Sequence, residues 1–460
     1  MLAELAAAVR EREVSARELV AESYRRIAER NEPLNAVIAL RDEEQAFREA
    51  EAVDPAADDD RPLLGLPLLV KDNEDVTGMR TTFGSLLRAD AEPATEDAEV
   101  VARLRAAGAI VVGKTNIPEF AFEGFTANRI FGVTGNPWAT DWSPGGSSGG
   151  SGAALMAGMA PLVTGTDGGG SVRIPASFCG FVGLKPTNGL IGQWPPPSWI
   201  DLSTKGPMAV SVADARLLLD VLRGPIAGAP SAAPSWSPRA DARPSRILAT
   251  ERLVRYGEPL PGALPKLFET ALEHLSAVTG LEVERIEAPF DPQLDDDWFG
   301  LCGAEELAWW GRDLIRERAE DLTSYARAAM HYAEEIDVSG YLAARRRRFE
   351  FARQADLLLG EDALLVSPML CVEGFFADGT LADADNPGTD SIHYNTNVAN
   401  TTGLPSISVP AGVSSIGVPF GLQLLGPRYG DDLLLNVAES WESAYPWPIS
   451  APAYDPFPIP

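Results

Sequence analysis

The chain has 460 residues, of which 45% are hydrophobic, and its formal net charge is −28 at pH 7. This length allows several domains, and this apolar content is enough to bury a large core. The acidic charge argues against nucleic acid and against an anionic membrane surface as partners, because both require a basic footprint.

The N-terminal part, residues 2–55, is predicted to be helical. Ser15 and Glu18 have the spacing of a capping box, and Val14 and Leu19 occupy the positions of a hydrophobic staple. These four residues predict that a helix begins directly after Ser15.

Strands and helices then alternate along the chain. Short apolar strands are expected at 66–70, 109–112 and 162–164, and helices at 98–107 and 152–160. Because the strands are apolar on both faces, they are typical of a parallel or mixed sheet buried between helices. The first half therefore indicates an α/β fold.

The second half has a different composition before the strands return. Residues 225–244 are rich in Pro, Ala and Ser and predict a surface connection, whereas residues 303–358 are mostly helical. Further strands are expected at 362–367 and 407–410. We therefore expect one large domain over 1–460, divided into N-terminal helices (1–60), a core (61–224), a helical insertion or cover region (225–360) and a return to the core sheet (361–460).

The cellular compartment of the protein and the presence of a metal can be predicted from the cysteine spacing, the N-terminal residues and the length of the apolar runs. The cysteines Cys179, Cys302 and Cys371 lack metal-ligand spacing, which predicts buried thiols in a reducing compartment. The first residues lack a basic leader, and no uncharged apolar run approaches the ~20 residues that span a bilayer. The sequence thus predicts a cytoplasmic protein with no metal, no organic cofactor and no membrane segment.

The segment from Gly145 to Lys185 is the most informative part of the chain. Ten of its first 29 residues are glycine, and two Gly-Gly-Ser loops flank one short stretch of small residues. Glycine packs little and loses much backbone freedom on folding, so this density suits backbone N–H groups that approach a reacting group. A loop such as Gly168 to Ser171 can hold an oxyanion while its serine attacks a carbonyl.

A serine nucleophile needs a base, and the histidines are poorly placed for that role. His274 and His331 lie in helical segments, which leaves His393 as the one tolerable partner for a nucleophile-elbow interpretation of Gly145 to Gly149. That motif follows a strand, and residues 141–144 do not form one. The elbow is therefore disfavoured.

Lysine is scarce in this chain, with five residues in all, and Lys71 ends a buried strand. A lysine acts as a base only when it is neutral, which requires burial or positive neighbours. Lys71 is thus a candidate base, and the alternative is a salt bridge with Asp72 or Asp167. The stretch from Gly108 to Thr115 matches a P-loop pattern, but its middle residues are strand formers, so nucleotide binding there is disfavoured.

Motifs over nearly the whole chain support an enzyme of one known type. They are Gly65-Leu66-Pro67, Lys71-Asp72, Thr81 to Ser85, Gly113 to Asn116, Asn136 to Trp138, Gly145 to Gly150, Asp167 to Pro175, Gly183 to Thr187, Asn400 to Pro405, Val409 to Gly412 and Gly421 to Gly426. In this order they resemble the amidase signature family of serine hydrolases. The resemblance implies a large mixed, mostly parallel β-sheet covered by helices on both faces, with a helical insertion in the second half.

The resemblance also implies a Ser–cis-Ser–Lys triad and hydrolysis of an amide through an acyl-enzyme. Ser171 matches the nucleophile, Ser147 the middle serine with a cis peptide bond before it, and Lys71 the base. The other matching residues are Gly168, Gly169, Gly170 and Ser171 for the oxyanion hole and Ser148, Asp167 and Arg173 for a supporting polar network. Position 168 usually carries a larger residue in the family.

The substrate is expected to be a small-molecule amide. Phe122, Trp194 and Trp199 are the candidate pocket residues, with Trp309 and Trp310 as further aromatics nearby, and a homodimer is an expected assembly. One alternative is the catalytic A subunit of a glutamyl-tRNA amidotransferase, although the Tyr-Gly and Ser-Ser-Leu-Asp-Gln elements usual there are missing after Thr187. The other alternative is a non-catalytic binding protein of the same fold, which would normally have lost one of the three triad residues.

Overall fold

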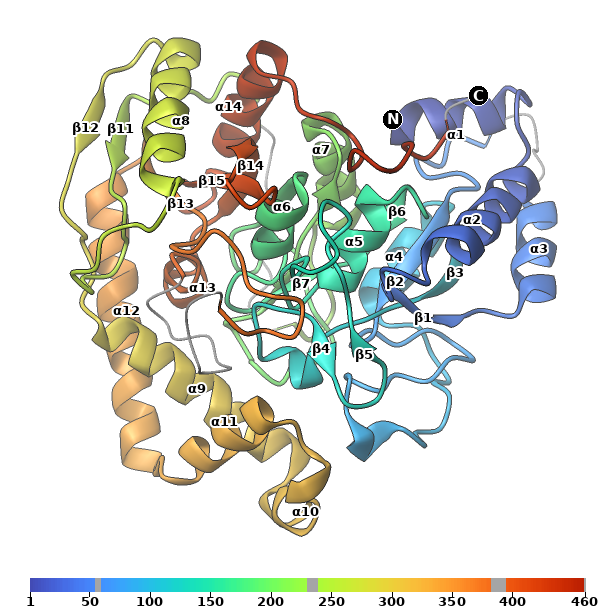
Figure 1. The fold of residues 1–460 in the computed structure, drawn as a ribbon, viewed down its shortest axis with the longest axis horizontal. Helices are drawn as coiled ribbons and strands as arrows, with labels where there is room; N and C mark the ends of the chain where they lie inside the picture. Colours follow the sequence, from blue (N-terminus) through green and yellow to red (C-terminus); the bar gives the residue numbers. More distant parts are fainter. Residues whose placement is uncertain (54–58, 230–238, 382–393, 459–460) are drawn as a thin grey trace.

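Two β-sheets form the framework of the molecule (Figure 1). The computed structural model of the chain describes residues 1–53, 59–229, 239–381 and 394–458. A four-stranded sheet has the order β1-β3-β2-β6 and consists of β1 (Val37–Leu40), β2 (Pro67–Lys71), β3 (Ile110–Thr115) and β6 (Leu162–Val163).

A seven-stranded sheet has the order β10-β8-β14-β15-β13-β11-β12. Its strands are β8 (Val182–Lys185), β10 (Met208–Ala209), β11 (Arg246–Ala249), β12 (Val283–Arg285), β13 (Ala363–Pro368), β14 (Ser406–Val413) and β15 (Pro419–Leu425). Two short antiparallel ladders pair β4 (Ala127–Asn128) with β5 (Gly132–Val133) and β7 (Thr166–Asp167) with β9 (Thr204–Lys205).

The helices surround these sheets. They are α1 (Leu2–Arg10), α2 (Ala16–Arg30), α3 (Glu43–Ala52), α4 (Glu99–Ala106), α5 (Gly149–Met156), α6 (Arg173–Cys179), α7 (Val212–Leu222), α8 (Leu264–Thr279), α9 (Gln293–Trp310), α10 (Arg312–Glu317), α11 (Ser324–Glu334), α12 (Val338–Leu359), α13 (Asn397–Thr402) and α14 (Asp431–Ala444). In Figure 1, α1 to α3 lie at one end of the molecule and α9 to α12 lie at the opposite lower edge.

Both faces of the seven-stranded sheet are covered by helices. Along β13, Leu364 and Val366 belong to the core cluster that includes residues of α8 and α14. The intervening Leu365 belongs to a second cluster that includes residues of α12 and α13. Because successive side chains of a strand point to opposite faces, helices cover the sheet on both sides, which confirms the predicted mixed α/β fold class.

The expectation of a mostly parallel sheet is wrong for the larger sheet. Four of its six strand pairings are antiparallel, and only the β13–β11 and β11–β12 pairings are parallel. The short connection from β14 to β15 explains one of these four pairings, because a tight turn can join only antiparallel strands. A buried apolar run does not reveal the direction of its neighbour.

The N-terminal prediction was right at the helix cap and wrong over a short stretch after it. The capping box of Ser15 and Glu18 is confirmed, with Glu18 N–H donating to Ser15 Oγ over 3.1 Å. Residues 37–40, however, form β1 rather than helix, and β1 pairs antiparallel with β3. The segment pairs with β3 at the edge of the four-stranded sheet. This pairing with a distant strand overrides the helical preference of the surrounding sequence.

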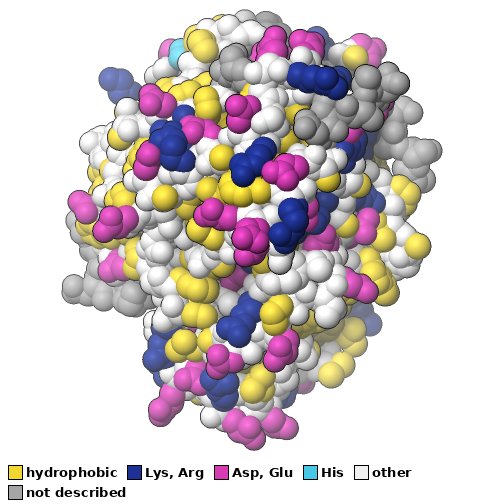
Figure 2. All heavy atoms as spheres, turned by 90° about the vertical axis from the view of Figure 1, so that its right-hand side faces the viewer, with side chains coloured by type: hydrophobic (Ala, Val, Ile, Leu, Met, Phe, Trp, Pro, Cys, Tyr) yellow, Lys and Arg dark blue, Asp and Glu magenta, His cyan; other side chains and the backbone are white. Residues whose placement is uncertain are grey.

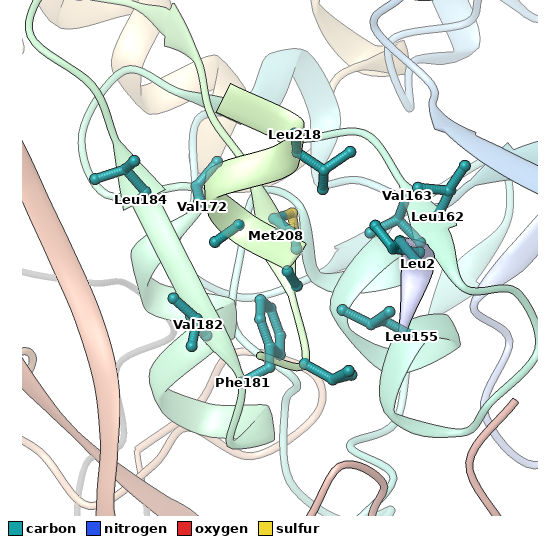
Figure 3. Packing of buried hydrophobic residues seen from close by; sticks show 14 of the residues in the cluster. Leu2, Leu155, Leu162, Val163, Val172, Phe181, Val182, Leu184, Met208 and Leu218 are labelled. Carbon is teal, nitrogen blue, oxygen red and sulfur yellow. The ribbon is translucent and has the colours of Figure 1, made fainter. Parts of the chain in front are cut away.

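A core of small and branched side chains lies beside the glycine-rich region (Figure 3). Leu155 of α5 packs in the same cluster as Phe181, Met208 and Leu218. All residues of α5 are buried, and they are mostly glycine, alanine or serine. Small side chains let the backbone of α5 approach β2 and α6 closely. The first Gly-Gly-Ser loop directly precedes α5 and the second directly precedes α6, so this close packing of the two helices brings the loops together.

Three further properties concern the helices, the surface charge and the cysteines. Within the described ranges, no helix combines the length and the apolar composition that a membrane crossing requires. The face drawn in Figure 2 carries acidic and basic side chains interspersed with one another. The three cysteines are buried and unpaired, as predicted.

Candidate active site

Lys71 lies at the end of β2 and is fully buried. Its Nζ donates to Ser147 Oγ over 2.8 Å and to Thr166 Oγ1 over 2.7 Å. Its backbone N–H donates to Thr164 Oγ1 over 2.8 Å. The end of β2 thus positions the Lys71 amine between the Ser147 hydroxyl of the first Gly-Gly-Ser loop and the Thr166 hydroxyl of β7.

Neither carboxylate that could have paired with Lys71 does so. Asp72 pairs with Lys114 at 2.8 Å, and Asp167 pairs with Arg173 at 2.9 Å. Burial lowers the pKa of Lys71 to about 7, and Lys205 acts in the same direction while Glu74 and Asp167 oppose it. A large fraction of Lys71 is therefore neutral near physiological pH.

Ser147 and Ser148 lie in the loop that precedes α5 and connect Lys71 with the second loop. The peptide bond between Gly146 and Ser147 is cis, as the resemblance implied. Ser148 N–H donates to the carbonyl of Ser171 over 3.2 Å, and Ser148 Oγ donates to the carbonyl of Thr166 over 3.4 Å. Ser147 is fully buried, whereas Ser171 is 8% exposed.

A buried ion pair holds the second loop in place. Asp167 accepts from Arg173 Nε and Nη2, each over 2.9 Å, and Asn400 Nδ2 donates to the same carboxylate. Burial by itself would raise the pKa of Asp167, but the Arg173 guanidinium and these hydrogen bonds hold it well below its usual range. Arg173 also donates to Gln423 Oε1 over 2.8 Å, which ties the loop to β15.

The four residues expected in the oxyanion hole are not equivalent. The N–H of Gly170 donates to Asp167 Oδ1 over 2.8 Å, so it is already engaged, and its assignment to the oxyanion hole needs this correction. The N–H groups of Gly168, Gly169 and Ser171 donate to no group in the described part of the chain. These three remain candidate donors to a developing oxyanion.

Two tryptophans explain the first two glycines of this loop. A Cβ at Gly168 would overlap the ring of Trp199, and a Cβ at Gly169 would overlap the ring of Trp298. Trp298 also donates its Nε1–H to the carbonyl of Gly168 over 2.8 Å. Position 168 therefore differs from the family pattern because an indole occupies the space that a larger side chain would need.

Gly169→Ala is expected to lower kcat/KM by up to about 100-fold, because a displacement of about 1 Å at a reacting centre has an effect of this size. The added methyl group would meet Trp298 and push the loop away. Steady-state kinetics on a substrate amide measures the loss. Gly340→Ala on α12, where the nearest atom lies 3.3 Å from the new Cβ, is the control and should keep full activity. Equal activity in both variants would contradict a role for this close packing.

Two cavities meet at Ser171. The larger, of about 180 Å³, is also lined by Ser147, Trp194 and Trp199. The smaller, of about 60 Å³, is lined by Phe122 and again by Trp199. The structure thus places all three candidate pocket residues on a cavity that Ser171 shares. Such an arrangement leaves separate space on two sides of Ser171.

Several groups at this site were not singled out from the sequence. Thr166 binds Lys71, Trp298 binds the glycine loop, and Thr396 Oγ1 donates to the carbonyl of Gly169. Glu306 on α9 lines the larger cavity. None carries a local signal except Thr166, whose position directly before Asp167 could have drawn attention to it.

The structure does not support the nucleophile-elbow or the P-loop interpretation. His274 stacks on Tyr445 with ring centroids 3.8 Å apart, and His331 is exposed on α11. His393 lies outside the described residues. Lys114 of the P-loop pattern is buried within β3, where its Nζ pairs with Asp72, so it is not available to a phosphate. Cys302 is buried against Trp199 and does not line either cavity.

The described residues hold no group of three or more His, Cys, Asp or Glu side chains that could bind a metal ion. The polar side chains that surround Ser147 and hold the second loop are hydroxyls, one amine and a buried ion pair. This set is suited to proton transfer between oxygen and nitrogen atoms.

Comparison with known proteins identifies the family to which the chain is similar over most of its length. The model of the family described as Amidase matches residues 18–435. The A subunit of the glutamyl-tRNA(Gln) amidotransferase of Thermus thermophilus is 38% identical over 435 residues, which cover 89% of each chain. The acylamidase of Rhodococcus erythropolis is 33% identical over 471 residues, which cover 98% of this chain and 96% of the relative.

Other matches are shorter or structural. The protein AmiB2 of Mycobacterium tuberculosis is 52% identical over 180 residues, and this match spans only 38% of either chain. Among solved structures, a 6-aminohexanoate cyclic dimer hydrolase, determined with its substrate, aligns with a TM-score of 0.86 at 30% identity and 98% coverage of both chains.

Proposed function

The chain belongs to the amidase family, and from this premise we propose that it hydrolyses a small carboxylic amide with Lys71, Ser147 and Ser171. The observation that carries the proposal is the hydrogen bond from the buried Lys71 Nζ to Ser147 Oγ. Burial lowers the pKa of Lys71 to about 7, and no carboxylate partner is found for it among the described residues. Burial also lowers the pKa of Lys185 to about 7, but Lys185 Nζ donates to the carbonyl of Pro186 and to Asn188 Oδ1 instead of a serine of the two loops.

The proposed reaction is acyl transfer in two steps. Neutral Lys71 withdraws a proton through the Ser147 hydroxyl, and Ser171 Oγ attacks the amide carbonyl carbon. Backbone N–H groups of Gly168, Gly169 and Ser171 stabilise the oxyanion, each well-placed donor contributing about 3–4 kcal/mol. The amine leaves after it takes up the proton through the same relay, and water then hydrolyses the acyl-enzyme to the acid.

A second candidate function is that of the A subunit of a glutamyl-tRNA amidotransferase, which the 38% identity to the Thermus protein favours. The segment 193–199 argues against it. This segment lines the larger cavity at Ser171 and replaces the Ser-Ser-Leu-Asp-Gln element usual in that subunit. A non-catalytic role is disfavoured because all three proposed triad residues are present and two of them are directly hydrogen-bonded.

The test uses the purified chain alone against a panel of aryl, alkyl, amino-acid and dicarboxylic amides. We expect hydrolysis of at least one simple amide and no glutamine-dependent amidation of charged tRNA. Release of acid and amine in a 1:1 ratio would be measured by chromatography. Glutaminase activity that depends on two further co-purified subunits would overturn this proposal in favour of the amidotransferase.

A further inference from the structure

Glu306 presents a buried carboxylate at the larger cavity. It lies on α9, lines this cavity together with Ser171, and is only 2% exposed. Its Oε1 accepts from Trp310 Nε1 over 2.6 Å. The side chains of Ser198 and Trp199 also lie beside the carboxylate, although Oε2 and Trp199 Nε1 do not form a hydrogen bond of normal length. These three neighbours are neutral, and a buried carboxylate with only neutral neighbours costs free energy that a cationic ligand would offset.

The neighbouring Glu305 shows that burial on this helix does not by itself leave a carboxylate without a cation. Glu305 Oε1 accepts from Tyr341 Oη over 2.7 Å and lies 3.7 Å from Arg345 Nη1, and its Oε2 accepts from the N–H of Ile200 over 2.9 Å. Glu305 does not line the cavity. The missing cationic partner is therefore a property of the cavity position and not of α9.

The charges along the cavity wall leave a negative excess. Lys205 pairs with Glu74, and Arg103 pairs with Glu99 over 3.0 Å. All four of these residues line the cavity, and the two acids that remain there without a basic partner among the described residues are Asp75 and Glu306. A cationic group in the cavity would thus meet net negative charge.

Aromatic rings line the same space. Trp194, Trp199 and Trp309 belong to the wall, and Trp194 and Trp309 are each about half exposed. Indole faces attract ammonium groups, with about 0.5–1 kcal/mol at exposed sites and more where water is excluded. A carboxylate at the inner end and indoles towards the opening form a suitable environment for such a group.

Burial raises the pKa of Glu306 to about 7, and the negative field of Glu305 acts in the same direction. Hydrogen bonding from the side chains of Ser198, Trp310 and Trp199 opposes this rise. The thiol of Cys302, one turn earlier on α9, is a further titratable neighbour. A bound cation would favour the ionised carboxylate and lower this pKa again.

We propose that Glu306 selects amides that carry an ammonium group, with the ammonium held at the Glu306 carboxylate and the amide carbonyl presented to Ser171. This inference rests on the proposed amide hydrolysis and adds a substrate class to it. Glu306 is then a specificity-determining residue and takes no part in the bond-breaking steps.

The experiment compares matched pairs of amides in which a terminal methyl group replaces the ammonium. The acyl-side pair is the anilide of 5-aminopentanoic acid against that of hexanoic acid. The amine-side pair is N-(5-aminopentyl)acetamide against N-hexylacetamide. The measured quantity is the ratio of kcat/KM within a pair, because any general effect on the triad cancels in this ratio.

We expect the ratio for at least one pair to fall by about 10-fold or more in Glu306→Gln, since hydrogen bonds to charged groups contribute more than neutral ones. Glu305→Gln is the matched control and should keep the native ratio. In the native chain the ratio should rise with pH through the titration of Glu306 and level off above it, because only the ionised carboxylate attracts the cation. The ratio in Glu306→Gln should not depend on pH over the same range.

Each result decides a separate question. An unchanged ratio in Glu306→Gln for both pairs would overturn the ammonium assignment, and so would a lower melting temperature with an unchanged ratio, which indicates a structural role only. If the native chain turns over none of the four compounds, calorimetry with Ser171→Ala tests binding, and absence of binding by both ammonium compounds overturns the assignment. Full activity in Ser171→Ala would instead overturn the proposed function.

Discussion

Ser171→Ala should abolish amide hydrolysis, with a loss of at least about 10⁴-fold in kcat, because removal of a serine nucleophile leaves only the stabilisation by the oxyanion hole and binding. Ser171 lies where the two cavities meet, and its loop carries three N–H groups without another acceptor in the described structure. The same substitution should prevent labelling by a fluorophosphonate probe, with the adduct in the native chain mapped to Ser171 by mass spectrometry.

The comparison variant for this experiment is Ser147→Ala. It removes the hydroxyl that accepts from Lys71 Nζ but leaves the nucleophile in place. We expect it to slow both hydrolysis and labelling while any adduct still forms at Ser171. An adduct at Ser147 alone, together with activity in Ser171→Ala, would reverse the two assignments.

Lys71→Ala should remove most amide turnover, by at least about 10³-fold, because no other base lies beside Ser147 in the described structure. In the native enzyme, log kcat/KM should rise with pH below about 7 and reach a plateau above it. The sign follows from the chemistry: the neutral amine accepts the proton, and burial has lowered the pKa of Lys71 to about 7. A pH profile over pH 5–9 with a neutral amide measures this rise.

Two controls separate catalysis from folding and from the histidine alternative. Lys71→Met should be inactive yet more stable to heat at neutral pH, because the lowered pKa means that the protonated amine is costly to bury. His393→Ala should keep nearly native activity. An inactive but folded His393→Ala variant would restore the nucleophile-elbow interpretation.

The order of elements and the position of Lys71 could be predicted from local patterns. The capping box at Ser15 and the strand that ends at Lys71 depend on residues close together in the chain, and both occur as expected. The strand at 37–40 and the antiparallel pairing of β14 with β15 depend on distant partners or on a turn. Hydrophobic runs report burial, but they do not report which neighbour provides it.

The sequence by itself determined the residue types of the candidate site: the two Gly-Gly-Ser loops, a serine at the end of each, and a lysine at the end of a buried strand. It left open whether Lys71 is a neutral base or forms a salt bridge with Asp72 or Asp167. Only the tertiary structure decided this, because Lys114 and Arg173 occupy those carboxylates and Lys71 turns to Ser147 instead.

The walls of the site were likewise decided by tertiary packing. Trp199 and Trp298 lie against glycines that are 30 or more residues away in the chain, and Glu306 meets the cavity from a separate helix. Electrostatic pairing and close contact act over a few ångströms in space, whereas sequence patterns carry information over a few residues along the chain. For this reason the residue types of the candidate site could be predicted from the sequence, while their charge states and the shape of the cavity at Ser171 required the fold.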